Sequence, residues 1–156
     1  MTPGRRELHF QHFDEISADL DRLLKGHDSV GGWSLGQILD HLATVTRRTL
    51  EAPADSPQAK DLSLRVSDAQ RDQVFATGKL PEGIPLPGTL GAPEDCDPSE
   101  AADRLRAALA DFEASPGPAA PHRLFGPLSK DQWRRLIGIH CAHHLSFAIP
   151  RDGSDS

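Results

Sequence analysis

Three histidines interrupt an apolar helical face near the end of the chain, and this restricts how the segment can be buried. They are His140, His143 and His144 in the run RLIGIHCAHHLSF. The stretch from Ser129 to about Ala148 has helical periodicity, and its apolar residues share one broad arc with these imidazoles. Such an arc can be buried only if the imidazole nitrogens find partners.

A fourth histidine, His41, lies far upstream in WSLGQILDHLA, at the edge of the apolar arc of another predicted helix. His140 and His144 lie one turn apart on one helical face, and His41 can reach them from a neighbouring helix. These three imidazoles would form a site with an open position. The spacing alone also allows His143 to replace His144, because residues three apart on a helix are neighbours too.

Hydrophobic periodicity predicts four long helices, at about 12–25, 34–51, 97–113 and 129–148. Their starts carry capping signals, since Ser34 and Ser129 each have a glutamine three residues later and Asp97 precedes a proline. The fold class that these helices indicate is all-α.

A proline-rich stretch, 52–96, separates the second and third helices and contains one short helical candidate at Ser67 to Ala76. We interpret the stretch as an ordered crossover within a single domain, 1–156, because it has neither repeats nor low complexity. A disordered tail is expected at about 151–156.

The composition excludes several classes of protein. A formal net charge of -6 gives no reason to expect nucleic-acid binding. No window approaches the roughly 18 apolar residues of a membrane span, and no signal-like apolar run follows the N-terminal arginines. We therefore expect no membrane association. The two cysteines, Cys96 and Cys141, lie far apart, which is typical of a reducing compartment and predicts a cytoplasmic protein.

The convergent histidines have an ordinary and a functional interpretation. One histidine on an apolar face is usually a hydrogen-bonded core residue. Three neutral imidazoles aimed at one point would leave lone pairs without donors, whereas a divalent cation uses one nitrogen from each. We therefore predict a bound transition metal, with zinc, nickel and iron as candidates. Three neutral ligands leave such an ion an open position, and it could activate water or a thiol.

Other residues are candidates for the surroundings of this metal. His143, if it is not a ligand, would support one, contact a substrate or pack in the core. His122 could approach the mouth of a pocket from the link before the last helix. The candidate apolar walls of the pocket, for which core packing is the ordinary alternative, are Trp33, Phe125, Trp133 and Phe147.

The sequence motifs that metalloproteases and di-iron proteins carry at their metal sites are missing from this sequence. Cys141 follows His140 and projects about 100° from it around the helix, so this segment has neither the glutamate of His-Glu-x-x-His nor a suitable thiolate ligand. The Glu-x-x-His pairs of di-iron proteins are also missing. Because no acid or base stands out, a second hypothesis stays open: a metal-stabilised helical protein that binds a ligand or partner without catalysis.

The chain resembles the DinB-like superfamily of metal-binding four-helix bundles. The resemblance rests on Trp33-Ser34, His41 after ILD, and His140-x-x-x-His144, while HRLFGPLSKDQWRRLIGIHCAHHLSF is similar to a branch known mainly as a domain of unknown function. It extends from Arg5 to Pro150 and includes the PxGIPLP-like stretch of the crossover.

The resemblance implies an up-up-down-down bundle with the long crossover between helices two and three. It also implies a metal held by His41, His140 and His144, and frequent dimerisation. Characterised members include thiol-dependent transferases and isomerases. A reaction of a low-molecular-weight thiol with a small electrophilic substrate is therefore the implied activity.

Overall fold

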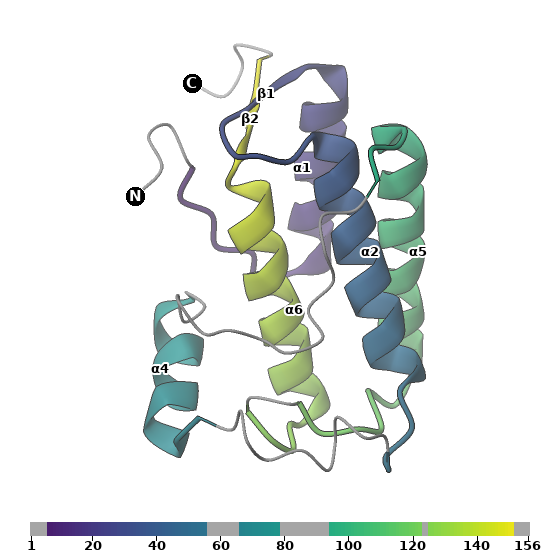
Figure 1. The fold of residues 1–156 in the computed structure, drawn as a ribbon. Helices are drawn as coiled ribbons and strands as arrows, with labels where there is room; N and C mark the ends of the chain where they lie inside the picture. Colours follow the sequence, from purple (N-terminus) through teal and green to yellow (C-terminus); the bar gives the residue numbers. More distant parts are fainter. Residues whose placement is uncertain (1–5, 56–65, 79–93, 123–124, 152–156) are drawn as a thin grey trace.

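The fold consists of five helices and two short strands among the residues that the computed structural model describes, 6–55, 66–78, 94–122 and 125–151 (Figure 1). Most of the predicted crossover at 52–96 lies outside these residues, as does most of the predicted tail at about 151–156. In chain order the elements are α1 (Phe13–Lys25), β1 (His27–Ser29), α2 (Leu35–Glu51), α4 (Asp68–Thr77), α5 (Pro98–Ala114), α6 (Lys130–Leu145) and β2 (Ala148–Pro150).

Three of the long helices begin directly after the predicted caps. The Ser34 and Ser129 hydroxyls accept hydrogen bonds from the backbone N–H groups of Gln37 and Gln132, and each glutamine side chain accepts from the serine N–H in return. Asp97 likewise caps α5. These bonds satisfy backbone donors that a helix start leaves free, so local sequence fixes where the helices begin. The short helix predicted in the crossover is α4.

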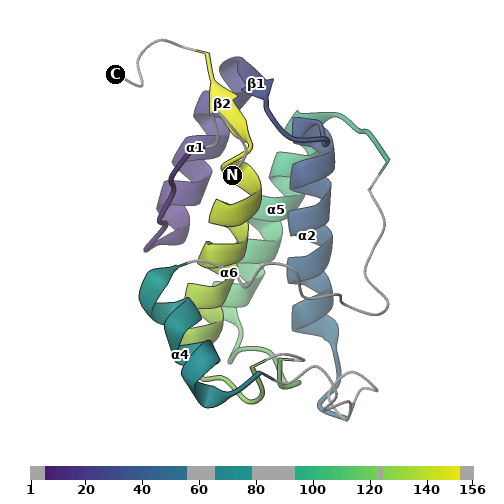
Figure 2. The same ribbon diagram turned by 60° about the vertical axis from the view of Figure 1, so that its left-hand side comes forward.

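The four long helices α1, α2, α5 and α6 lie side by side (Figures 1 and 2). α2 packs against α5 and α6, and α1 packs against the same two helices. The largest side chains that these contacts remove from solvent are apolar: Phe112, Ile16, Leu20, Leu23, Leu35, Ile38, Leu39, Leu42, Leu105, Ile139 and Leu145. Their burial is the main favourable contribution to folding.

The helices run up, down, down and up in chain order (Figure 1), so the predicted up-up-down-down order is wrong. β1, which follows α1, pairs antiparallel with β2, which follows α6. The link from α1 to α2 is thus held at the end where α1 finishes, and α2 must return from there. At the same end the Ser34 hydroxyl donates to the Asp95 carboxylate, 2.6 Å, which places the starts of α2 and α5 together.

The two-stranded sheet also corrects the purely helical prediction. His27 pairs with Pro150 and Ser29 with Ala148. α6 ends at Leu145 and not at 148, because the backbone beyond it forms hydrogen bonds with the β1 segment, including Val30 N–H to the Phe147 carbonyl. Strands of only three residues have too little alternation to be recognised in a sequence.

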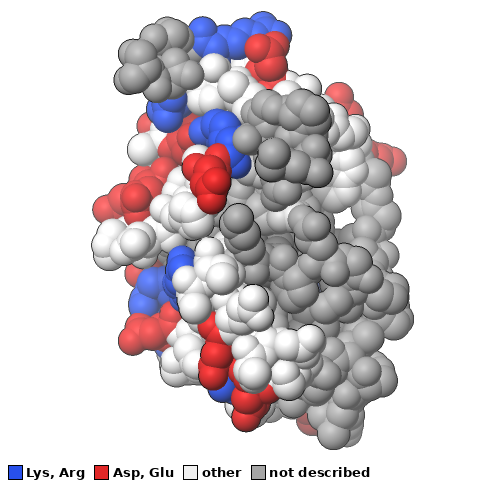
Figure 3. Space-filling view, turned by 90° about the vertical axis from the view of Figure 1, so that its left-hand side faces the viewer, with Lys and Arg blue, Asp and Glu red and all other residues white. Residues whose placement is uncertain are grey.

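Acidic and basic side chains are interspersed on the face that carries α4 (Figure 3). On α4 itself, Arg71 lies 3.5 Å from Asp68 and 3.0 Å from Asp72. Exposed pairs of this kind contribute little to stability. Among the described helices, none is both long and apolar enough to cross a lipid bilayer.

An ion pair ties the N-terminal segment to the helices. The Arg6 guanidinium donates to both oxygens of the Asp19 carboxylate, at 2.8 and 2.9 Å, and to the Leu145 carbonyl at 3.1 Å. Asp19 is only 5% exposed, so its charge depends on this partner.

A close backbone contact joins the start of α2 to the segment before α5. A Cβ atom on Gly36 would lie 2.1 Å from the backbone oxygen of Cys96 and 3.0 Å from its carbonyl carbon. No non-glycine residue fits there without moving one of the two backbones.

We predict that Gly36→Ala destabilises the protein by about 1–3 kcal/mol, because the clash outweighs the gain of about 1 kcal/mol that alanine brings to a helix. The measurement is urea unfolding. Gly32→Ala is the matched control, since its Cβ would meet no atom within 4 Å. An equal free energy of unfolding for wild type and Gly36→Ala would contradict the contact.

We predict that Arg6→Leu costs about 3 kcal/mol, because it leaves the buried Asp19 carboxylate without its main partner. The double variant Arg6→Leu/Asp19→Leu should be more stable than Arg6→Leu alone, since it removes the unpaired charge. Chemical denaturation of the three proteins measures this. A double variant that is less stable than Arg6→Leu would show that the charge is not what makes the single change costly.

Candidate metal centre

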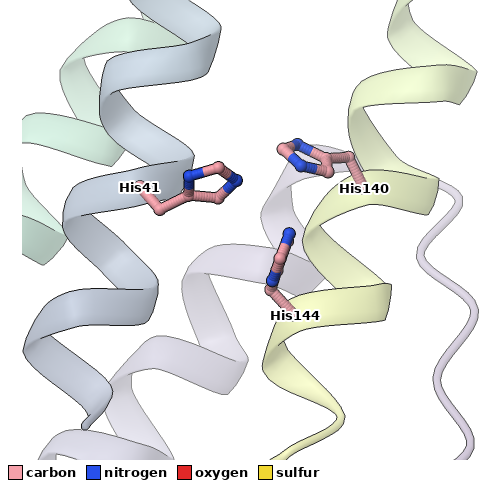
Figure 4. A group of neighbouring side chains, drawn as sticks. All are labelled: His41, His140 and His144. Atoms are coloured by element: carbon pink, nitrogen blue, oxygen red, sulfur yellow. The ribbon is translucent and has the colours of Figure 1, made fainter. Parts of the chain in front are cut away.

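The structure brings together His41 from α2 with His140 and His144 from α6 (Figure 4). The ring centroids are 5.3 Å apart for His41 and His140, 4.6 Å for His41 and His144, and 4.8 Å for His140 and His144. One nitrogen of each ring lies within 4.8 Å of the other two, so the group could hold a metal ion. We call these three residues the histidine cluster.

Helix geometry explains why the rings meet. Residues four apart lie one above the other on a helix, which puts the His140 and His144 rings on the same face of α6. On α2, His41 follows the buried Ile38 by one turn and precedes the buried Leu42. Its ring therefore points from the edge of the packed face towards α6, as Figure 4 shows.

The donor set fits a divalent transition metal. Zinc–nitrogen bonds of about 2.0–2.1 Å place the nitrogens of a tetrahedral site roughly 3.4 Å apart, so modest side-chain rotations would close the cluster on an ion. The Nδ1 atom of His41 is buried without a hydrogen-bond partner among the described residues. A buried imidazole nitrogen in that condition is destabilising unless another group satisfies it.

Burial keeps the His41 and His140 rings in the neutral state that binds metals. Burial, with a smaller contribution from the neighbouring His41, His143 and His122, lowers the pKa of His140 to about 3. Burial also lowers the pKa of His41, with Asp40 opposing the shift. Both imidazoles are therefore neutral at neutral pH, with a lone pair available for coordination.

Trp33 covers one side of the cluster. Its ring meets the His41 ring edge-on at 5.2 Å and stacks parallel to the His144 ring at 5.7 Å. The residue directly precedes the cap Ser34, so the same hydrogen bonds that start α2 also position the indole.

His143 lies outside the histidine cluster. Its ring packs edge-on against His144, at 4.9 Å, and Phe147, at 5.9 Å. All three residues line a pocket of about 210 Å³ beside the cluster. The structure thus groups His144, rather than His143, with His41 and His140.

The remaining predicted site residues pack elsewhere. The His122 ring stacks on Phe125, at 4.7 Å, and lies 5.4 Å from Trp133, while its Nδ1 accepts a hydrogen bond from the Phe125 N–H. Phe125 and Trp133 are buried in the core. Cys141 is fully buried, which raises its pKa to about 12, and it is not part of the cluster.

Sequence reasoning missed part of the pocket beside the cluster. Gly31, Gly32 and Ile38 line it together with Trp33. The sequence did contain a signal, because two adjacent glycines directly precede Trp33. Adjacent residues without side chains can leave open space next to an aromatic ring.

Comparison with protein families finds one match. Residues 3–151 match the family described as "Protein of unknown function (DUF1569)". Neither a curated protein nor a solved structure matches the chain. The geometry of the site is therefore the basis on which a function can be argued.

We predict that metal-free protein loses stability as the pH falls from about 6 to 4.5. The folded state keeps His140 neutral while the unfolded chain binds a proton below its pKa of 6.5, so the free energy of unfolding should fall by about 1.4 kcal/mol per pH unit for this group. Urea unfolding in the presence of a chelator measures the slope.

His140→Gln provides the comparison for that slope. Glutamine is neutral at every pH. The free energy of unfolding of this variant should therefore change less steeply with pH than that of wild type, by the contribution of about one proton. Identical slopes would show that burial of His140 does not suppress its protonation.

Proposed function

The chain belongs to DUF1569, a family of proteins of unknown function, and from the geometry of its histidine cluster we propose that it is a metal-dependent enzyme. His41, His140 and His144 hold one divalent transition metal: zinc, nickel or iron. The substrate is a small electrophilic molecule, and the nucleophile is a thiol or water. The convergence of three imidazole nitrogens from two helices is the observation that carries the proposal.

A bound divalent ion would supply a Lewis acid with its full double charge, since all three ligands are neutral, and with room for a thiol or water. The chain's own residues supply the rest. The imidazoles fix the position of the site, and Trp33 shields one side of it from solvent. No cysteine, aspartate or glutamate of the described residues belongs to the cluster, which supports an open position over a closed structural site.

The nearest carboxylate in the sequence has another role. Asp40 precedes His41 but accepts a hydrogen bond of 2.7 Å from Arg104 on α5. That ion pair joins α2 to α5, so the Asp40 carboxylate is engaged with α5. The arrangement supports a cluster made of imidazoles alone.

The thiol assignment rests on resemblance. Four long helices, the Trp33-Ser34 start of α2 and the positions of the three histidines support membership of the DinB-like superfamily, whose four-helix bundles include thiol-dependent enzymes. Both cysteines are free thiols in the structure, which supports a cytoplasmic location where low-molecular-weight thiols are abundant.

A non-catalytic alternative has one observation in its favour. Apart from imidazoles, neither the cluster nor the described lining of its pocket includes a side chain that could act as an acid or base. In that case the metal stabilises the packing of α2 on α6, and the pocket binds a ligand that is not transformed.

We predict that tag-free wild-type protein contains about one equivalent of metal. Replacement of His41, His140 or His144 by alanine should reduce the content to near zero, because two imidazoles hold an ion far less tightly than three. Elemental analysis after dialysis measures the content, and melting before and after chelation shows whether the metal stabilises the fold.

His143→Ala is the matched control, since it removes a neighbouring imidazole that lies outside the cluster. It should keep its metal. Metal lost equally from all four variants would indicate binding by the histidine-rich segment in general. Wild type without metal, and with a melting temperature indifferent to added divalent ions, would refute the metalloenzyme proposal.

A further inference from the structure

The pocket beside the histidine cluster has a defined set of walls. We call it the glycine pocket; it has a volume of about 210 Å³ and is lined by Gly31, Gly32, Trp33, Ile38, His143, His144 and Phe147. It shares His144 with the cluster, and its Trp33 contacts the rings of both His41 and His144. A molecule bound at the cluster is therefore within reach of this pocket.

Gly31 and Gly32 matter because they lack a side chain, and not because of their backbone conformation. Neither is among the glycines with positive φ, so other residues could adopt their backbone angles. A Cβ on Gly31 would lie 3.1 Å from the Phe147 ring, so the missing side chain lets this ring pack against the backbone. A Cβ on Gly32 would meet nothing within 4 Å, so the missing side chain leaves open volume.

The walls favour a neutral and planar occupant. None of the described residues that line the pocket is a lysine, arginine, aspartate or glutamate. Trp33 and Phe147 provide aromatic surfaces and Ile38 an aliphatic one, and aromatic rings pack well against such walls in stacked or edge-on arrangements. A charged group would lose part of its hydration there, and the described lining residues offer it no carboxylate, ammonium or guanidinium partner.

The volume indicates the size of the group that the pocket can bury. An apolar cavity of about 150 Å³ holds one benzene molecule, and sites for drug-sized ligands have about 300–1,000 Å³. The glycine pocket lies between these values. It has room for one six-membered ring with a short attachment.

We propose that the glycine pocket binds a neutral, planar apolar group, of the size of a single ring, belonging to the substrate whose reactive atom is placed at the histidine cluster. This inference rests on the proposed metal site and adds the class of substrate: a small aryl-bearing molecule rather than a charged or extended one.

Two hydroxamates that differ only in the tail test this inference on cobalt(II)-loaded protein. Acetohydroxamate and benzohydroxamate present the same metal-binding group, and the second adds a phenyl ring. Binding is followed through the visible absorption of cobalt. Burial of the ring should make benzohydroxamate bind at least about tenfold more tightly.

Substitutions in the pocket should abolish this preference without removing the metal. Gly32→Leu fills the open volume and Phe147→Ala removes a wall, so in each variant the two hydroxamates should bind within about threefold of each other. Asp103→Ala is the control and should keep the wild-type preference, because Asp103 is an exposed residue of α5 that does not line the pocket. Cobalt content, measured in every variant, should stay the same.

The possible outcomes separate the two proposals. Acetohydroxamate binding without a preference for the phenyl ring would overturn the pocket inference and leave the metal site intact. A preference that persists in both Gly32→Leu and Phe147→Ala would also overturn it, because the ring would then bind elsewhere. Failure of wild type to take up cobalt would refute the metal site, and the inference that rests on it.

Discussion

Imidazole nitrogens that lie between two packed helices need partners, and the proposed site between α2 and α6 depends on this requirement. α6 carries two imidazoles on the face that it turns to α2, where a third one meets them. Burial makes protonation of His41 and His140 unfavourable, so these two imidazoles are not satisfied as cations at neutral pH. A divalent ion would satisfy three such nitrogens at once, which is why we propose that the cluster holds a metal.

The start of α2 is the junction that positions this centre. Ser34 caps the helix and also bonds to Asp95, and Gly36 allows the backbone of Cys96 to lie against α2. Trp33, one residue before the cap, is thereby held against the histidine rings. A few adjoining residues thus connect the ends of two helices to one wall of the site.

Few reactive side chains are available near the cluster, and this limits the kinds of reaction that we propose. Asp40 is paired with Arg104, Cys141 is a buried thiol, and His143 faces the pocket. Catalysis would therefore depend on the Lewis acidity of the ion and on the position of the substrate, rather than on a general base. The glycine pocket would offer such positioning, because it lies beside the cluster and has room for a small group.

Local sequence determined the starts of α2, α5 and α6, the short helix α4, and the shared face of His140 and His144, since caps and helical periodicity depend only on nearby residues. The tertiary structure decided the direction of the helices, the β1–β2 pairing, the separation of His143 from the cluster and the glycine pocket. Each of these depends on contacts between residues far apart in the chain. The three residues of β1 form a strand only because the residues after α6 pair with them. The role of the glycines before Trp33 is likewise visible only from the ring of Phe147 that packs against Gly31.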